Sequence, residues 1–479
     1  MKGTIIFGGS QTLTILINVV RGKLIAMILG AYGMGVSSLL QSAINPFQQL
    51  FSLSLPTSAV RSISLETGNN RLHTILAFQR ILLWLSTAGM LTMMVTSSWL
   101  SQFTFGDDEH QLWFCGLAVS LFFLMMTAGE SAILQGFRKI KQLATVAVVA
   151  PALGLIIGIP LYYYWNVEGI VPAMIIINFA SWITARYFTR DLRPKGLFQS
   201  RRSTWRIGRG MLTLGAAMML SSFIGTVVTY LLNTFIRTYS MEDVGMYQAA
   251  ISITLQCTSM IFASMAADYF PHLSTVVNDI KDTRQLVEQE GEIVLLIMTP
   301  VTLLLILFAP TIVYVLLTPQ FATIIPTLRM ISISFIARAF CFPQDYVCIA
   351  KGDKSFFFWV EGVYTNVKTL LLFGAGYYLF GFEGLGYAAI ANSVIDILSS
   401  AILNQWRFKV HYSYTYLKLF VPCLIMAVVC IGGSFICEQQ MSFQVMAITT
   451  LLCCVYSYIQ LDRRLNLKEI IHQKKLRRK

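Results

Sequence analysis

Residues 14–29 read TILINVVRGKLIAMIL, an almost unbroken apolar run that carries two cations, Arg21 and Lys23. A cation at the centre of a lipid bilayer costs roughly 2.5–3.5 kcal/mol on insertion scales. Two such charges in one segment need compensation from a water-lined cavity, an acidic side chain or an anionic substrate. The compensating group decides what this segment does.

The composition is that of an integral membrane protein. Of the 479 residues, 56% are hydrophobic and only 12% are charged, and the mean hydropathy is +0.65. A soluble domain is about a quarter charged. The apolar runs are too long for barrel strands, and a helix satisfies its own backbone groups in lipid, so we predict an all-α polytopic fold. The fourteen predicted spans are 4–30, 34–65, 74–100, 112–136, 142–164, 168–188, 210–237, 244–275, 287–317, 323–350, 355–380, 384–406, 414–437 and 442–461.

The start of the chain and its cysteines carry no processing or metal signal. Met1-Lys2-Gly3 has no basic cluster and no cleavage site follows, so we expect the first segment to be a retained span. The nine cysteines all lie in apolar segments without metal-ligand spacing. We expect them to be packing residues.

Basic residues fall on alternate connections between the spans. They cluster at 138–141, 190–209, 351–354 and 463–479, whereas intervening connections such as 107–109 are acidic. This positive-inside bias predicts that both termini are cytoplasmic, and an even number of spans agrees. The net charge of +13 therefore reflects membrane orientation rather than nucleic-acid binding.

The most polar internal stretch divides the chain into two halves. We predict an N-terminal six-helix lobe (1–190), a basic cytoplasmic linker (191–209), a C-terminal six-helix lobe (210–407), two additional peripheral helices (408–461) and a basic cytoplasmic tail (462–479). No connection is long enough to form a catalytic domain.

Polar residues recur at corresponding places in the two halves. The offset is 211 to 215 residues for the pairs Lys23 and Arg237, Arg61 and His272, and Glu130 and Asp345, and Gly33-Met34 recurs as Gly245-Met246. A duplicated unit is what many transporters use to build a central site that opens alternately to each side. The last two spans have no such counterpart.

Five intramembrane cations are candidates to bind an anionic group: Lys23, Arg61, Arg21, Arg237 and Arg338. Arg21 and Lys23 lie about 26–28 Å along the first span, in its outer half or near the outer interface. Snorkelling of the head groups to the interface is the alternative for Arg21, Lys23 and Arg61. Arg338, about mid-span, cannot easily reach an interface.

Four intramembrane acids are candidates for coupling transport to an ion gradient: Glu130, Asp345, Glu361 and Asp268. Interfacial ion pairs, for example with Arg138 or Lys351, are the alternative. Asp268 precedes His272 by one turn, which predicts either a proton-responsive pair or a local hydrogen bond.

The sequence contains no nucleotide-binding loop, nucleophile elbow, zinc motif or acidic metal cluster. We therefore expect neither an enzyme nor a cofactor or metal. Five motifs instead resemble bacterial O-antigen and lipid III translocases, which are polysaccharide flippases of the multidrug/oligosaccharidyl-lipid/polysaccharide (MOP) exporter superfamily. They are GKLIAMILGAYGMG (22–35), QGFR (135–138), EDVGMYQ (242–248), FPHLS (270–274), and AK (350–351) with FFFWVE (356–361).

The resemblance implies a V-shaped pair of six-helix lobes around a cationic cavity. The substrate would be an undecaprenyl-diphosphate-linked oligosaccharide moved to the periplasmic leaflet of the bacterial inner membrane, with the polysaccharide polymerase machinery as a partner. Lys23 and Arg61 fall where the family has basic residues, which implies a diphosphate-facing role. Arg21 is not covered by the motif, the two extra spans depart from twelve-helix members, and Asp268 and Asp345 replace uncharged residues. Coupling to H+ or Na+ is left open.

Other classes explain the sequence less well. A MATE-like drug/cation antiporter of the same superfamily is the alternative, but it would want acidic cavity residues where the candidates here are mostly basic. A membrane-bound polymerase or glycosyltransferase would need a large extracytoplasmic loop or an acidic metal motif. A purely structural membrane protein would not need so many intramembrane ions.

Overall fold

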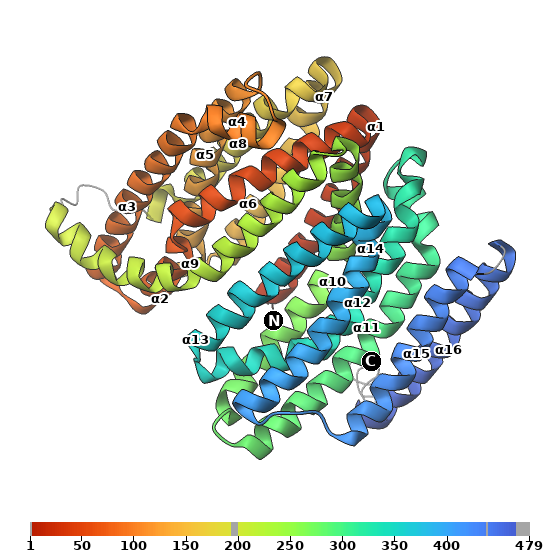
Figure 1. The fold of residues 1–479 in the computed structure, drawn as a ribbon. Helices are drawn as coiled ribbons and strands as arrows, with labels where there is room; N and C mark the ends of the chain where they lie inside the picture. Colours follow the sequence, from red (N-terminus) through yellow and green to blue (C-terminus); the bar gives the residue numbers. More distant parts are fainter. Residues whose placement is uncertain (1, 193–199, 437–438, 466–479) are drawn as a thin grey trace, which may run out of the picture. The chain divides into compact units, whose positions relative to one another are not determined.

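The computed structural model describes residues 2–192, 200–436 and 439–465, and in these ranges short connections join helices, with no strand (Figure 1). The predicted all-α polytopic fold is confirmed. Residues 193–199 of the predicted linker and 466–479 of the predicted tail lie outside the described residues, as does Cys437. The eight cysteines with described side chains are free thiols.

Eleven helical stretches of the described chain are long and apolar enough to cross a membrane. Three of them, Leu13–Ser52, Ile140–Leu192 and Lys354–Phe408, are each interrupted. The interruptions are Gly30 with φ 64°, the 3-10 turn Asn166–Gly169, and Gly381 with φ 61°. A residue without a Cβ adopts positive φ at little cost, so the two glycines let a helix fold back on itself. Dividing the three stretches at these points gives fourteen spans, which is the predicted number.

The chain forms two compact units. Unit 1 contains Met1–Gln248 and Leu316–Gln320, and unit 2 contains Ala249–Val315 and Phe321–Lys479. The helices that lie in unit 1 are α1 (Lys2–Ser52), α2 (Leu55–Leu65), α3 (Gly68–Val95), α4 (Ser97–Phe105), α5 (Gln111–Gly136), α6 (Ile140–Leu153), the π-helix η1 (Gly154–Gly158), α7 (Ile159–Trp165), η2 (Asn166–Gly169), α8 (Ile170–Thr189), η3 (Arg190–Leu192) and α9 (Arg201–Arg237).

The helix α10 (Met241–Val276) begins in unit 1 and continues in unit 2, and α11 (Ile280–Leu316) and η4 (Pro319–Ile324) also cross between the units. The remaining helices of unit 2 are α12 (Ile325–Lys351), α13 (Lys354–Phe356), the π-helix η5 (Phe357–Tyr364), α14 (Thr365–Phe408), α15 (Tyr414–Ile436) and α16 (Gln439–Leu465).

The seventh span, α9, belongs to unit 1 because it packs against α1, α2 and α3. The helix begins at Arg201, inside the predicted linker, where the Ser200 hydroxyl caps it by accepting a hydrogen bond from the backbone N–H of Ser203 (3.2 Å). Compact unit 1 thus extends 58 residues beyond the predicted lobe end at 190, to Gln248. The six-plus-six division of the repeats stays a prediction.

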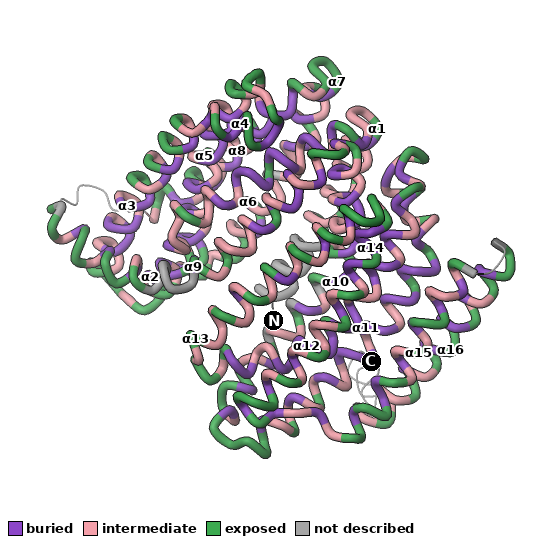
Figure 2. The backbone as a smooth tube through the Cα atoms, in the orientation of Figure 1, coloured by how far each residue is buried: buried purple, intermediate pink, exposed green. Residues whose placement is uncertain are grey.

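The core of unit 1 is formed where the second half of α1 meets α5 and α8. Leu39, Leu40 and Ile44 of α1 are fully buried there, as is Phe114 of α5. Figure 2 shows buried and exposed residues alternating along the helices, as expected when each helix has one packed side.

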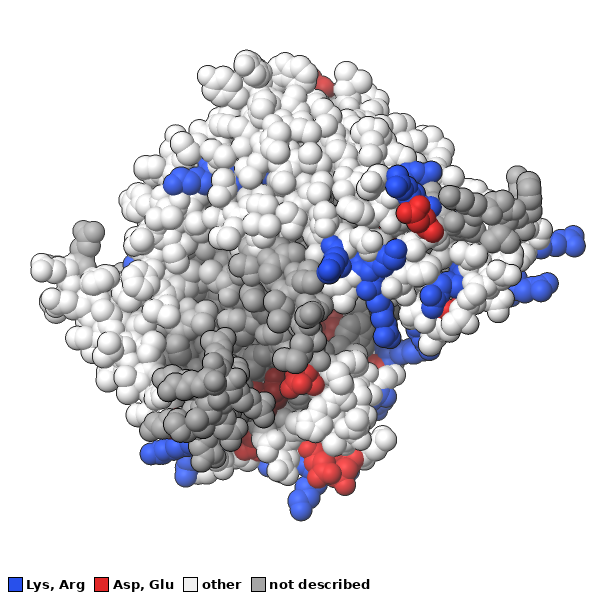
Figure 3. Space-filling view, turned by 180° about the vertical axis from the view of Figure 1, so that it is seen from behind, with Lys and Arg blue, Asp and Glu red and all other residues white. Residues whose placement is uncertain are grey.

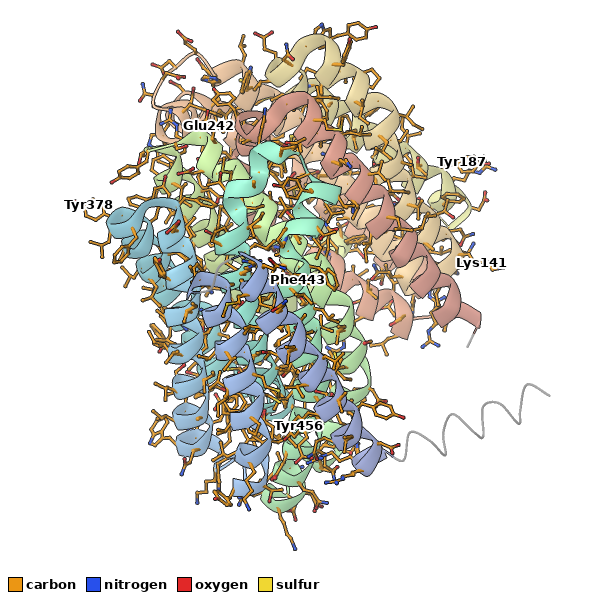
Figure 4. All side chains as sticks on the ribbon, turned by 90° about the vertical axis from the view of Figure 1, so that its right-hand side faces the viewer. Lys141, Tyr187, Glu242, Tyr378, Phe443 and Tyr456 are labelled. Atoms are coloured by element: carbon orange, nitrogen blue, oxygen red, sulfur yellow. The ribbon has the colours of Figure 1, made fainter. Side chains whose placement is uncertain are left out.

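The outward faces of the helices are apolar. Most of the surface visible in Figure 3 is uncharged. Figure 4 shows Tyr187 and Tyr378 pointing away from their helices, and their exposed fractions are 57% and 69%. Exposed apolar and aromatic side chains of this number suit a hydrocarbon solvent and not water.

The last two helices are held to unit 2 by polar contacts. The Arg464 guanidinium of α16 donates to both carboxylate oxygens of Glu292 in α11, from Nε at 2.6 Å and from Nη2 at 3.3 Å. Two residues before α15, the Tyr412 hydroxyl donates to the Phe340 carbonyl of α12 (2.8 Å). Arg464, the third residue of the predicted tail, therefore belongs to a packed helix.

Candidate functional site

A charged cavity of about 250 Å³ lies inside unit 2, between α12, η5 and α14. Its charged lining residues are Arg338 and Asp345 of α12, Glu361 of η5 and Asp396 of α14. Hydroxyl and carboxamide groups complete the wall, among them Asn392 and others of α14. A mixed cluster of this kind inside a spanning bundle marks a functional site by default.

Lys368 compensates one of the three acids. Its ammonium forms an ion pair with Asp396, and the Asn392 amide donates to the other carboxylate oxygen of Asp396 (2.7 Å). The Lys368 side chain is only 9% exposed, and its ammonium lies 5.4 Å from the Tyr364 ring centroid. Asp396 thus has a fixed partner in the folded chain.

Arg338 faces the remaining acids of the cavity. Its guanidinium carbon lies 5.5 Å from the centroid of the Phe262 ring, a cation–π contact that orients the side chain. Counting Lys368, the cavity holds two cations against three carboxylates. One carboxylate is therefore in excess, and in a site of low dielectric the excess charge favours uptake of a proton or a cation.

Glu361 sits in the widened turns of a π-helix. The Asn366 amide of α14 donates to the backbone carbonyls of Glu361 (3.1 Å) and Gly362 (2.8 Å), and the Thr365 hydroxyl donates to that of Val360 (3.0 Å). These side chains donate hydrogen bonds to backbone carbonyls, which the wider turn of a π-helix leaves with weaker backbone partners. Short π-helical segments of this kind are frequent at functional sites.

The other candidate acids lie elsewhere. Glu130 in α5 is 2% exposed and accepts a hydrogen bond from the Thr189 hydroxyl of α8 (2.6 Å), with the Arg186 guanidinium 3.9 Å away. Both of these partners come from α8, and the interfacial pair suggested with Arg138 stays a prediction. Asp268 lies on an exposed face of α10. Glu130 therefore braces two helices, and Asp345 and Glu361 are the candidates that share a cavity.

The candidate cations of unit 1 have separate surroundings. Arg21 lies against η1, where a Cβ on Gly154 would lie 2.9 Å from the Arg21 Nε. This Nε is buried without a partner among the described residues. Lys23 is half-buried on α1 and Arg61 is exposed on α2. At the end of α9, the Arg237 guanidinium lies 6.0 Å from the Phe105 ring centroid.

Neither Arg21 nor Lys23 forms an ion pair with a described residue. This contrasts with Lys368, whose charge is met by Asp396. Of the three ways to compensate a cation in the membrane, an acidic side chain is thus absent for this pair within the described chain. Water or an anionic ligand is left.

Lys368 and Asp396 also lie within apolar runs, but they were not among the candidate site residues predicted from the sequence. A signal was present, because the two residues lie 13 and 15 positions on either side of Gly381. A helix that folds back at Gly381 brings them to the same level, but no sequence feature says that it folds back there. Among the described residues, no group of three or more His, Cys, Asp and Glu side chains is placed to hold a metal ion.

A model of the family described as "Polysaccharide biosynthesis protein" matches residues 69–326, more than half of the chain. The chain belongs to this polysaccharide biosynthesis protein family. It is also 23% identical over 282 residues to the lipid III flippases of Escherichia coli (strain K12) and Shigella flexneri, covering 56% of this chain and 65% of each relative. The match thus spans just under two thirds of those relatives.

The fold of this family member is found in solved transporters. The lipid II flippase MurJ, in an inward closed conformation, superposes with a TM-score of 0.75 at 14% identity, covering 96% of this chain and 99% of that chain. An inward-facing multidrug resistance MATE family transporter of the MOP superfamily gives 0.69 at 15% identity, over 85% and 96% of the two chains. These relatives are flippases and transporters rather than enzymes, and the predicted resemblance to polysaccharide flippases is confirmed at the level of family and fold.

Proposed function

We propose that this protein is a flippase that moves an undecaprenyl-diphosphate-linked oligosaccharide from the cytoplasmic to the periplasmic leaflet of the bacterial inner membrane. The observation that carries the proposal is the pair of membrane-embedded cations on α1, Arg21 and Lys23, without an acidic partner among the described residues. A diphosphate supplies the missing negative charge through charge-assisted hydrogen bonds. Family membership and the similarity to lipid III flippases support the same substrate class.

In this proposal Lys23 and Arg61 bind the diphosphate, and Arg21 and Arg237 contribute positive potential from the same unit. Arg338 was grouped with them on sequence, but it lines a cavity with Asp345 and Glu361. We assign Arg338 to that acidic cluster, where it balances charge. The lipid tail stays in the bilayer while the headgroup crosses by alternating access of the two lobes.

The charged cavity of unit 2 is the proposed ion-coupling site. Asp345 and Glu361 share one cationic partner, Arg338, because Lys368 is held by Asp396. Uptake of one H+ or Na+ neutralises the cavity, and its release restores the excess charge. The site therefore distinguishes two states by one elementary charge, which is what coupling to a gradient or to the membrane potential requires.

A MATE-like cation antiporter is the second candidate. The three acids of the unit 2 cavity and the fold similarity to a MATE family transporter favour it. Against it, two of these charges are already met by Lys368 and Arg338, so little is left to attract a cationic drug. The cations Arg21 and Lys23 on α1, which meet no acid among the described residues, would repel one.

The decisive experiment is flipping of lipid-linked oligosaccharide in liposomes containing the purified protein. Lys23→Ala and Arg61→Ala should each slow flipping about tenfold or more, the scale of a lost hydrogen bond to a charged group. Lys418→Ala removes an exposed lysine of α15 and is the matched control, expected to flip at the wild-type rate. Unchanged flipping in both Lys23→Ala and Arg61→Ala overturns the cation site, and drug efflux without lipid flipping overturns the function.

Coupling is tested in the same liposomes with an imposed proton or sodium gradient. Asp345→Asn and Glu361→Gln keep the shape of the cavity but remove a charge, and they should flip at a rate that no longer responds to the gradient. Asp282→Asn, an exposed acid at the start of α11, should respond as wild type does. A full gradient response in both cavity variants would refute this assignment.

A further inference from the structure

A second cavity, of about 290 Å³, lies inside unit 1 between the two halves of α1, α9 and the start of α10. None of its described lining residues is charged. The wall instead carries hydroxyl and carboxamide groups, including Ser38, Gln41, Asn45, Thr229, Asn233 and Gln248. It therefore differs in chemistry from the charged cavity of unit 2.

Asn233 is the strongest sign of a missing ligand. The residue is 1% exposed and lines the cavity, yet neither its Oδ1 nor its Nδ2 has a hydrogen-bond partner among the described residues. Buried polar side-chain atoms in native proteins nearly always have a partner, so an orphaned donor and acceptor in one side chain require an explanation. A ligand with adjacent hydroxyl groups supplies both partners.

The facing helix offers a second carboxamide pair. Gln41 and Asn45 are one turn apart on α1, and the Gln41 Nε2 donates to the Asn45 Oδ1 (3.1 Å). This bond leaves the Gln41 carbonyl and the Asn45 amino group for a ligand. The Ser42 hydroxyl is turned to the Leu39 carbonyl of its own helix (2.8 Å), so the carboxamides supply the free groups of this stretch.

Gly22 places this cavity beside the cation pair. It lines the cavity and lies between Arg21 and Lys23, and a Cβ built on it would meet no atom within 4 Å. In a lipid-linked oligosaccharide the first sugar is bonded directly to the diphosphate. The order along the substrate, diphosphate then sugar, is thus matched by cations and an uncharged polar cavity at adjoining residues of α1.

We propose that this cavity binds the sugar bonded to the diphosphate, with Asn233 as its central hydrogen-bonding residue and Gln41 and Asn45 on the facing wall. The inference rests on the proposed function, because it takes the diphosphate to lie at Lys23. The volume is near the lower end for ligand pockets, which suits one or two sugar rings rather than a whole repeat unit. A neutral wall lacks the positive charge that favours a diphosphate, so the two parts of the headgroup are bound by separate chemistry.

The test compares binding of two lipids to the purified full-length protein: undecaprenyl diphosphate, and undecaprenyl diphosphate carrying one hexose or N-acetylhexosamine. Wild type should bind the glycosylated lipid about three- to tenfold more tightly, the range for one or two net hydrogen bonds. Asn233→Ala should lose this preference and keep its affinity for the bare lipid. Lys23→Ala should weaken the binding of both lipids to the same degree. Asn69→Ala, at an exposed position of α3, should bind both lipids as wild type does.

The outcomes separate the two proposals. If neither lipid binds wild type, the proposed function fails. If wild type binds both lipids equally, or if Asn233→Ala keeps the preference, the sugar site is refuted while the diphosphate site stands. Gly22→Leu is the second variant, since Gly22 lines the cavity and has open space at its Cβ position, and it too should lose the preference. Retention of the sugar preference by both variants means that the cavity holds only water.

Discussion

Gly35 and Gly245 form a close helix crossing that a single methyl group can test. They lie on the second half of α1 and the first turns of α10, both in unit 1. A Cβ on Gly245 would lie 2.0 Å from the Ala31 carbonyl oxygen, and a Cβ on Gly35 would lie 2.1 Å from that of Met241. Both obstacles are backbone atoms, which cannot rotate away. Small residues allow this approach between membrane helices.

The magnitude follows from these distances. Real Cβ contacts are at least 3.0 Å, so either alanine must push the two backbones apart by about 1 Å. Overpacking of this kind costs about 1–3 kcal/mol. We therefore expect Gly35→Ala and Gly245→Ala each to destabilise the protein by that amount in detergent, measured by thermal unfolding. The destabilisation of the double variant should be smaller than the sum for the two single variants, because the first alanine already moves the two helices apart at the crossing.

Gly374→Ala is the matched control. It lies within α14, where a Cβ meets no atom within 4 Å, so alanine should be neutral or stabilise by up to about 1 kcal/mol through helix propensity. Equal stability of Gly245→Ala and Gly374→Ala would refute the close crossing. Full additivity in the double variant would show that the two glycines act at independent contacts.

Two further predictions concern single acids. Glu130→Ala should lower the free energy of unfolding by about 2–4 kcal/mol, because it leaves the Thr189 hydroxyl without its acceptor and creates a cavity at a buried position. Glu130→Gln should lower it by less than half of this amount. Equal losses in the two variants would contradict the proposal that Glu130 links α5 to α8. The Phe356 N–H and the Arg407 guanidinium hold the pKa of Asp353 below its ordinary value, so this acid stabilises the folded state above about pH 4 and ceases to as the pH falls through the lower folded-state pKa. The free energy of unfolding of the wild type should therefore exceed that of Asp353→Asn by about 0.5–1 kcal/mol at pH 7, because Asn keeps the helix cap but loses the charge. The difference should vanish near pH 2. A difference that stays constant across pH would contradict this.

The sequence predicted the fold well because lipid imposes a simple rule. A backbone in hydrocarbon must satisfy its own hydrogen bonds, so each long apolar run is a helix, and their number can be counted. The ends of the helices were harder to predict where a helix continues beyond the membrane. α9 starts at Arg201, among residues predicted to form a linker, because polar residues outside the bilayer are as compatible with helix as with loop.

The candidate site was only partly predictable. Charges in apolar runs singled out Asp345, Glu361 and Arg338 as candidates, because such charges are costly anywhere in a span. They did not reveal the partners. Glu130 and Asp345 correspond in the repeat, yet one braces α5 against α8 and the other lines a cavity. Equivalent positions in the two halves therefore carry different chemistry.

Sequence by itself determined that this chain is a polytopic helical membrane protein with cations inside its first span, since hydropathy and charge are properties of single segments. Tertiary structure alone decided which charges are compensated. Lys368 meets Asp396 because Gly381 reverses the chain between them, while Arg21 and Lys23 meet no described acid. Ion pairing depends on distances between helices far apart in sequence, and no periodicity within one helix contains that information.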